Sequence, residues 1–138
     1  MGDWYWIGLA VGLGVAIGIL FAGALAGSRM GVALAVVLAA GGGLLAGLGI
    51  GEWDEAIAGA IGGVLGVGGA VPLLQGTLER GGTRAATAVW IALGALLVGA
   101  LSLIPAVGYL MAVAVPVIGA RMRTRAPQKY AGLRTLAK

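Results

Sequence analysis

Residues 85–120 read AATAVWIALGALLVGALSLIPAVGYLMAVAVPVIGA, and the way this stretch divides into helices decides the fold. As one helix, its 36 residues would extend about 54 Å, far more than the roughly 30 Å of a bilayer's hydrocarbon core. Pro105 lies near the middle, and a proline disfavours helical backbone at the residue before it. The stretch therefore predicts two helices, over residues 85–103 and 106–120.

The remainder of the chain is as apolar as this stretch. Of its 138 residues, 60% are hydrophobic and 10% are charged, and the mean hydropathy is +1.04. Soluble domains carry about a quarter charged residues, so this chain has too few to cover a water-facing surface. Residues 4–26, 30–50 and 56–74 form three more apolar runs, each near the 20 or so residues that a helix needs to cross a membrane. The composition predicts an all-α integral membrane protein, with one compact transmembrane domain (1–120) and a basic juxtamembrane tail (121–138).

Charged residues alternate between acidic and basic groups along the chain, and this alternation favours five spans. Asp3 precedes the first run, Arg29 follows it, an acidic segment (52–55) follows the second, and Arg80 and Arg84 follow the third. Lys and Arg in short loops remain on the cytoplasmic side. Five spans with the N-terminus outside and the C-terminus inside keep every basic residue inside. The alternative of four spans places either the tail or the basic loops outside. We therefore predict a multi-pass protein of the cell's inner or plasma membrane.

Glycine accounts for 28 of the 138 residues and is concentrated in the first three spans. Small residues four positions apart let helices approach closely in lipid. Eight such pairs occur: Gly8/Gly12, Gly14/Gly18, Gly23/Gly27, Gly27/Gly31, Gly43/Gly47, Gly47/Gly51, Gly59/Gly63 and Gly62/Gly66. Random placement would give roughly five or six pairs, so the concentration of glycine in the first three spans is more informative than the number of pairs. It predicts close packing of the first three helices with the last two around them. The alternative is a coding bias towards Ala and Gly.

The third span contains the most helix-breaking residues, reading GGVLGVGGAVPLLQG over residues 62–76. Two interpretations remain open. The favoured one is a kinked helix packed against its neighbours. The other is an interrupted helix whose free backbone groups line a cavity or pore, as in transporters. The candidate cavity residues in that case are Gly66, Gly68, Gly69, Pro72 and Gln75.

Acidic residues precede the third span and allow two interpretations. The favoured one has Asp54 as the N-cap of the third helix, with Glu52 and Glu55 near the positive end of its dipole. The alternative is a site for a hard cation such as Ca²⁺. The chain has no Cys and no His, which removes thiolate chemistry and most zinc and copper sites. We expect no metal and no cofactor.

The basic loop before the fourth span is predicted to form a tight turn in which Thr83 caps the next helix. An alternative is that its backbone amides and Arg80 and Arg84 receive a phosphate.

The tail after residue 120 is basic without interruption, with six basic residues and no acidic one: Arg121, Arg123, Arg125, Lys129, Arg134 and Lys138. Next to a membrane, each contributes about 1 kcal/mol to binding anionic lipid headgroups. We expect this role rather than nucleic-acid binding. Either a short amphipathic helix after Pro127 or an unstructured basic tail fits the pattern.

The predicted spans contain no ionisable side chain, which argues against proton-coupled transport and against an intramembrane enzyme. We therefore predict a small non-enzymatic protein that works by helix packing, as a structural or accessory subunit or as a homo-oligomer. The alternative, from a different class, is a small channel or transporter with a permeation path at the third helix.

Overall fold

The computed structural model describes residues 2–79, 81 and 83–131, with the side chains of Glu79 and of residues 125–131 excepted. These residues form five helices, which are α1 (Asp3–Leu25), α2 (Arg29–Ile50), α3 (Trp53–Glu79), α4 (Arg84–Leu101) and α5 (Pro105–Ala131). All five are long and apolar enough to cross a membrane. The prediction of five such helices rather than four is confirmed.

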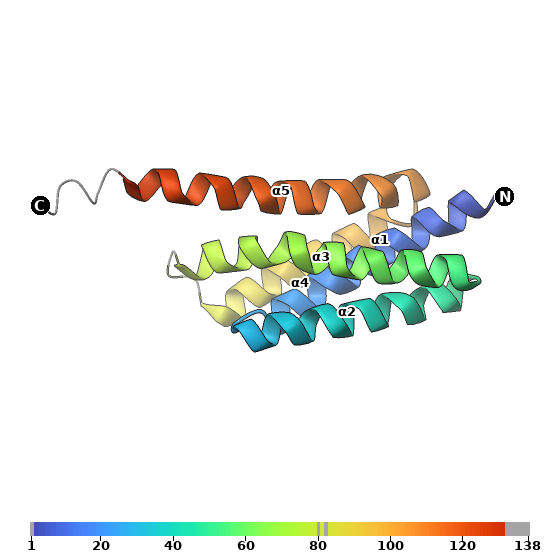
Figure 1. Cartoon of the computed structure of the whole chain (residues 1–138), viewed down its shortest axis with the longest axis horizontal. Coiled ribbons are helices and arrows are strands. Elements are labelled where there is room, and N and C mark those ends of the chain that lie inside the picture. The colour runs from blue at the N-terminus through green and yellow to red at the C-terminus, as the bar shows by residue number, and fades with distance from the viewer. Residues whose placement is uncertain (1, 80, 82, 132–138) are drawn as a thin grey trace, which may run out of the picture.

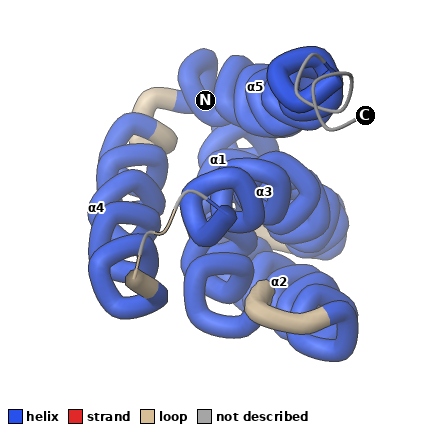
Figure 2. Tube along the Cα trace, turned by 90° about the vertical axis from the view of Figure 1, so that its left-hand side faces the viewer, coloured by secondary structure: helices blue, strands red, loops and turns tan. Residues whose placement is uncertain are grey.

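The helices run alternately in opposite directions along one axis (Figure 1). Helices α1 and α3 lie at the centre, with α2, α4 and α5 around them (Figure 2). Helix α4 packs mainly against α1 and has little contact with α3 or α5. The α1–α2–α3 group is therefore the core of the bundle, and α4 is its most loosely held member.

Glycines on α3 bring its backbone directly against both neighbours. Gly59 and Gly63 lie against backbone carbonyls of α2, while Gly62 and Gly66 lie against backbone carbonyls of α1. A Cβ atom added at any of these four positions would overlap a carbonyl oxygen of the facing helix. At 3.6 residues per turn, the two pairs lie about 60° apart around α3. They therefore occupy adjacent strips of its surface, and one helix can approach two neighbouring partners closely.

The turn between α4 and α5 is fixed by a proline and a buried serine. Pro105 is the first residue of α5, where its missing N–H breaks no helical hydrogen bond. Ser102 is fully buried; its hydroxyl donates to the Val98 carbonyl at 2.6 Å, and its side chain occupies the space that Gly12 of α1 leaves free. This turn therefore anchors α4 and α5 to the first half of α1.

The N-terminus of α3 differs from the predicted cap. Helix α3 begins at Trp53, so Asp54 lies inside the first turn and its assignment as the N-cap is wrong. The Glu52 carbonyl accepts the first helical hydrogen bond from Ala56, at 3.2 Å, and the Glu52 amide donates to Glu55 Oε2, at 2.8 Å. A glutamate at the third helical position is the one that can reach back to the cap amide. At α4 the prediction is confirmed, because the Thr83 hydroxyl accepts a hydrogen bond from the Ala86 amide at 3.4 Å.

Helices α3 and α5 are the longest of the bundle, with 27 residues each. At about 1.5 Å per residue, each extends about 40 Å, which exceeds the hydrocarbon core of a bilayer. Helix α5 continues beyond residue 120, where the predicted fifth span ends, as far as Ala131. Residues 121–131 thus extend the span, while the amphipathic helix expected after Pro127 falls mostly on residues outside the described part of the chain.

Candidate functional site

The candidate cavity residues of α3 lie in an unbroken helix. Helix α3 runs through Pro72 without interruption, as the favoured interpretation of this segment expects. Gly66, Gly69 and Pro72 are buried, and Gly66 lies against α1 while Gly69 lies against Val115 and Gly119 of α5. The structure therefore brings these three into helix contacts.

The other two candidates, Gly68 and Gln75, are exposed on the outer surface of α3. No atom lies within 4 Å of the position that a Cβ at Gly68 would occupy. None of the five candidates lines the cavity that is described below, although Gln75 directly follows the lining residue Leu74. Because Pro72 has no N–H, the carbonyl of Gly68, four residues earlier, lacks its helical hydrogen bond even though the helix continues. The pore interpretation of this segment stays a prediction.

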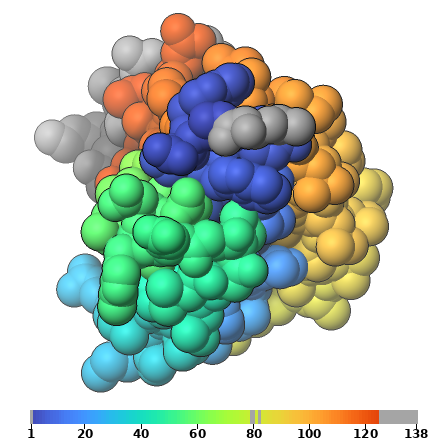
Figure 3. All heavy atoms as spheres, turned by 90° about the vertical axis from the view of Figure 1, so that its right-hand side faces the viewer, coloured from blue at the N-terminus to red at the C-terminus, as the bar shows by residue number. Residues whose placement is uncertain are grey.

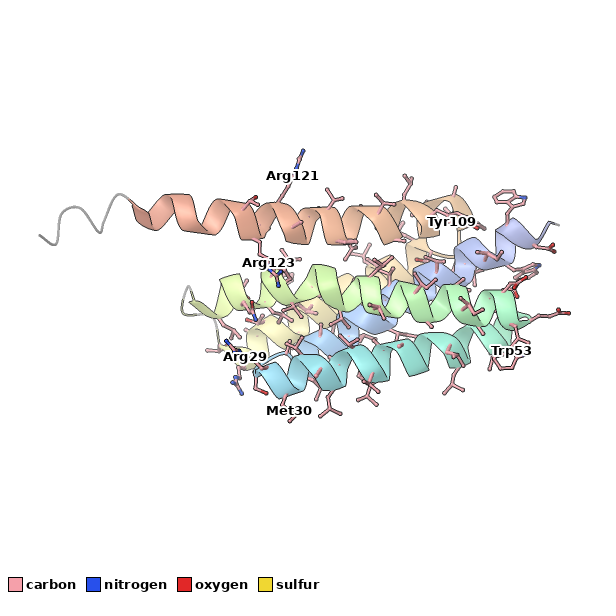
Figure 4. The ribbon with its side chains drawn as sticks, viewed as in Figure 1. Arg29, Met30, Trp53, Tyr109, Arg121 and Arg123 are labelled. Atoms are coloured by element: carbon pink, nitrogen blue, oxygen red, sulfur yellow. The ribbon has the colours of Figure 1, made fainter. Side chains whose placement is uncertain are left out.

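The described charges separate to the two ends of the bundle. Arg29, Arg121 and Arg123 lie towards one end, and Trp53 and Tyr109 lie at the other (Figure 4). Arg121 points away from the bundle, whereas Arg123 points towards α3. Arg84, at the start of α4, adds a fourth arginine at the end that also holds the start of α2 (Figure 1). We call this the basic end.

The structure describes only part of the remaining residues of the predicted headgroup contact. Arg125 and Lys129 lie on α5, but their side chains are outside the described part of the molecule. Arg134 and Lys138 lie outside the described residues altogether. The contact of the tail with headgroups stays a prediction.

The opposite end is closely packed. In the space-filling view of this end, atoms of α1, α2, α3 and α5 abut one another (Figure 3). The Tyr109 hydroxyl donates to the Trp4 carbonyl at 2.9 Å, which ties α5 to the start of α1. Glu55 is only 7% exposed and its carboxylate serves the cap of α3, next to Gly51. Within the described residues, no group of three carboxylates lies close enough to hold a metal ion.

The basic end contains a cavity of about 390 Å³. It is lined by the end of α1 and the turn after it (residues 22–28), by Leu74 and Leu78 of α3, and by the first residues of α4. Its polar side chains are Ser28, Arg84 and Thr87. The Ser28 hydroxyl accepts a hydrogen bond from the Gly31 amide at 3.0 Å, because it is the N-cap of α2.

Arg84 and Thr87 are the two polar side chains of this cavity that do not serve a cap. The Arg84 guanidinium lies beside the α1–α2 turn, where a Cβ added at Gly27 would be 3.0 Å from one of its nitrogens. Thr87 is 8% exposed. The sequence predicted Arg84 as part of the turn and, as an alternative, as a phosphate contact together with Arg80, whereas it did not single out Thr87. The available signal was a threonine one helical turn after an arginine, since residues three apart share a helix face.

The outer helices α2, α4 and α5 all present exposed apolar faces. On α2, Val37 and Leu45 are 68% and 69% exposed. On α4, Trp90 and Leu96 are 72% and 65% exposed. Gly41 also opens outwards from α2, with no atom within 4 Å of its missing Cβ.

Comparison with protein families, curated proteins and solved structures found no match to this chain.

Proposed function

We propose that the protein is a small, non-enzymatic multi-pass membrane protein that works by helix packing, as a self-assembling or accessory subunit. The observation that carries this proposal is the backbone-to-backbone packing of α1, α2 and α3 through glycine. The largest fully buried side chains are only Val15, Val67 and Ser102. An interior of small residues at close approach suits a rigid scaffold in lipid, where packing rather than the hydrophobic effect holds helices together.

The buried polar groups support a role without catalysis. Among the described residues these are Glu55, Thr87 and Ser102. Glu55 holds the N-terminus of α3, and Ser102 bonds to the carbonyl four residues earlier in its own helix. Neither is paired with a base or a nucleophile, the arrangement that an acyl-transfer or hydrolytic site requires.

The outward face of α2 is the proposed surface for self-association. Lipid tails cover exposed Val and Leu side chains without cost, so exposure alone requires no partner. Two exposed glycines, Gly41 and Gly49, distinguish α2 from α4, whose Gly94 also has no atom within 4 Å of its missing Cβ but is only half-exposed. A small residue on an outward face lets the helix of another chain approach closely. We therefore assign the α2 face around Val37, Gly41 and Leu45 to contact with a second copy.

Single-cysteine crosslinking tests this assignment, because the chain has no Cys of its own. Leu45→Cys on α2 and Leu96→Cys on α4 form a matched pair, with 69% and 65% exposure. We expect Leu45→Cys to form disulfide-linked dimers in native membranes and Leu96→Cys to remain monomeric. Light scattering in nanodiscs then gives a mass above one protomer. Gly41→Leu places a large side chain in the proposed contact and should lower the yield of crosslinked dimer. A mass of one protomer, with no crosslink at either cysteine, would contradict self-assembly.

We further propose that the N-terminus lies outside and the C-terminus inside the cell's inner or plasma membrane, with the basic tail on anionic headgroups. The gathering of four described arginines at the basic end supports this orientation, since short basic loops are retained in the cytoplasm. The extension of α5 beyond the hydrocarbon thickness supports contact between its basic continuation and the headgroup layer.

A further inference from the structure

The side chains that line the cavity at the basic end suit a ligand with one anionic part and one apolar part. Arg84 and Thr87 of α4 face it from one side, and the described residues that line it include no acidic side chain. Leu74 and Leu78 of α3, together with alanines of α1 and α4, supply apolar walls. Inorganic anions need only the polar part, so the apolar walls point to a ligand with a hydrocarbon portion.

Within the described residues, the exposed Arg84 side chain and the Thr87 side chain have hydrogen-bond donors that no protein group accepts. The hydrogen bonds among the described residues include none from the Arg84 guanidinium and none involving the Thr87 hydroxyl. Thr87 is more than nine-tenths buried, and a threonine inside a helix commonly bonds to the carbonyl four residues earlier. Here the Thr83 carbonyl instead receives only the Thr87 backbone amide, at 3.0 Å, within the described hydrogen bonds. Among the described residues no buried side-chain oxygen lacks a partner, so the Thr87 hydroxyl is accessible from the cavity that the residue lines and is free to bond to a ligand oxygen there.

The location of the cavity fits a lipid. Arg84 is the first residue of α4, so the polar rim lies at the end of the span, where phosphate groups of the bilayer lie. Leu74 lies one turn deeper than Leu78 along α3, towards the hydrocarbon. The cavity is lined by Leu74 and Leu78 of α3 and by residues of α4, so the space for an acyl chain lies where these two helices have little contact.

We propose that this cavity binds one anionic phospholipid, with its phosphate on Arg84 and Thr87 and the start of its acyl chains against Leu74 and Leu78. Charge-assisted bonds from a guanidinium to phosphate are among the strongest single polar contacts in proteins. The site is separate from the proposed self-association, because α4 and the end of α1 lie away from the outward face of α2 (Figure 2).

Native mass spectrometry of the full-length protein, purified free of lipid and then titrated, tests the proposal. The probes are phosphatidylglycerol, phosphatidylcholine and inorganic phosphate. We expect one phosphatidylglycerol to be retained in preference to phosphatidylcholine. Arg84→Gln should weaken this binding at least about tenfold, because a hydrogen bond to a charged group is lost. Thr87→Val, which keeps the shape of the side chain but has no donor, should weaken it less.

Two controls separate this site from general attraction to a basic surface. Arg29→Gln removes one charge at the same end, from an exposed side chain that does not line the cavity, and should leave binding unchanged. Ala88→Leu keeps every charge and fills the cavity, so it should weaken lipid binding. Equal losses in Arg29→Gln and Arg84→Gln would overturn the proposal, as would equal retention of the two lipids.

Inorganic phosphate distinguishes the two sources of the same anion. If phosphate alone raises the melting temperature as much as phosphatidylglycerol does, and Ala88→Leu has no effect, the site takes free anions and the lipid assignment is wrong. Circular dichroism of each variant checks folding, and Thr87→Val remains informative if Arg84→Gln does not fold. If the protein is monomeric and still retains the lipid, only the proposal of self-association is wrong. The proposals of self-association and of lipid binding can therefore fail independently.

Discussion

Two glycines in neighbouring helices show how much the surroundings of a single residue matter. At Gly63 on α3, an added Cβ would overlap the Ala39 carbonyl of α2. At Gly41 on α2, the same atom would meet nothing within 4 Å. Both glycines lie well inside a helix and away from its ends. Gly63 is required because two backbones approach closely there, whereas a side chain at Gly41 would leave the fold of the protomer unaffected.

Alanine at these two positions should therefore act in opposite directions. Gly63→Ala should destabilise the bundle by about 1–3 kcal/mol, because α2 must move away from α3. Gly41→Ala should be neutral or stabilise it by up to about 1 kcal/mol, since alanine favours helix over glycine. Unfolding in mixed micelles, followed by circular dichroism, measures both. Equal effects would favour a coding bias as the origin of the glycines.

The type of a residue predicted the role of some residues correctly and of others wrongly. Thr83 was correctly identified as a cap, because a threonine directly before an apolar run is a strong local signal. Asp54 was misassigned, because the cap position depends on where the helix begins, and boundaries shift by one or two residues. Thr87 lies one helical turn after Arg84, which places both on one face of α4, but its burial at a cavity depends on residues of α1 and α3 and could not be predicted from the sequence.

At the scale of helices, the contact of the α4–α5 turn with α1 is specific enough to test by compensation. A Cβ added at Gly12 would overlap the Ser102 side chain. Gly12→Ala should therefore displace the turn and lower stability by about 1–3 kcal/mol. Adding Ser102→Gly removes the overlapping atoms and should restore part of the loss.

The double-mutant cycle for Gly12 and Ser102 isolates their coupling from other effects. Rescue is expected to be partial, because the backbone of Gly108 on α5 also lies 2.8 Å from the added Cβ. Strictly additive losses would show that the turn does not pack against Gly12.

The number and order of helices could be predicted from the sequence, whereas their neighbours could not. Apolar length, the charged loops and Pro105 are local signals, and they predicted five helices whose ends lie within a few residues of the observed ones, except that α5 continues to Ala131 instead of ending at residue 120. Glycine pairs also predict close approach, but in a chain with 28 glycines they are too frequent to identify partners. The pairs Gly59/Gly63 and Gly62/Gly66 face different helices, α2 and α1, and only the fold shows which.

At the scale of the whole molecule, the alternation of five helices gives the bundle two chemically different ends. The starts of α2 and α4 bring Arg29 and Arg84 to the end where α5 carries Arg121 and Arg123. The opposite end holds the start of α3 with Trp53 (Figure 4). In a membrane, this polarity predicts one orientation, with the basic end in the cytoplasm.

Cysteine labelling tests both the orientation and the number of spans. Met30, 74% exposed, lies at the basic end, whereas Trp53, 69% exposed, and Leu103, 61% exposed, belong to the opposite end. In spheroplasts, a membrane-impermeant maleimide should label Trp53→Cys and Leu103→Cys directly. Met30→Cys should react only after the membrane is opened. If Met30→Cys alone is labelled in intact spheroplasts, the orientation is the reverse of the predicted one. If Leu103→Cys stays unlabelled even after the membrane is opened, residue 103 lies inside the bilayer, as four spans require.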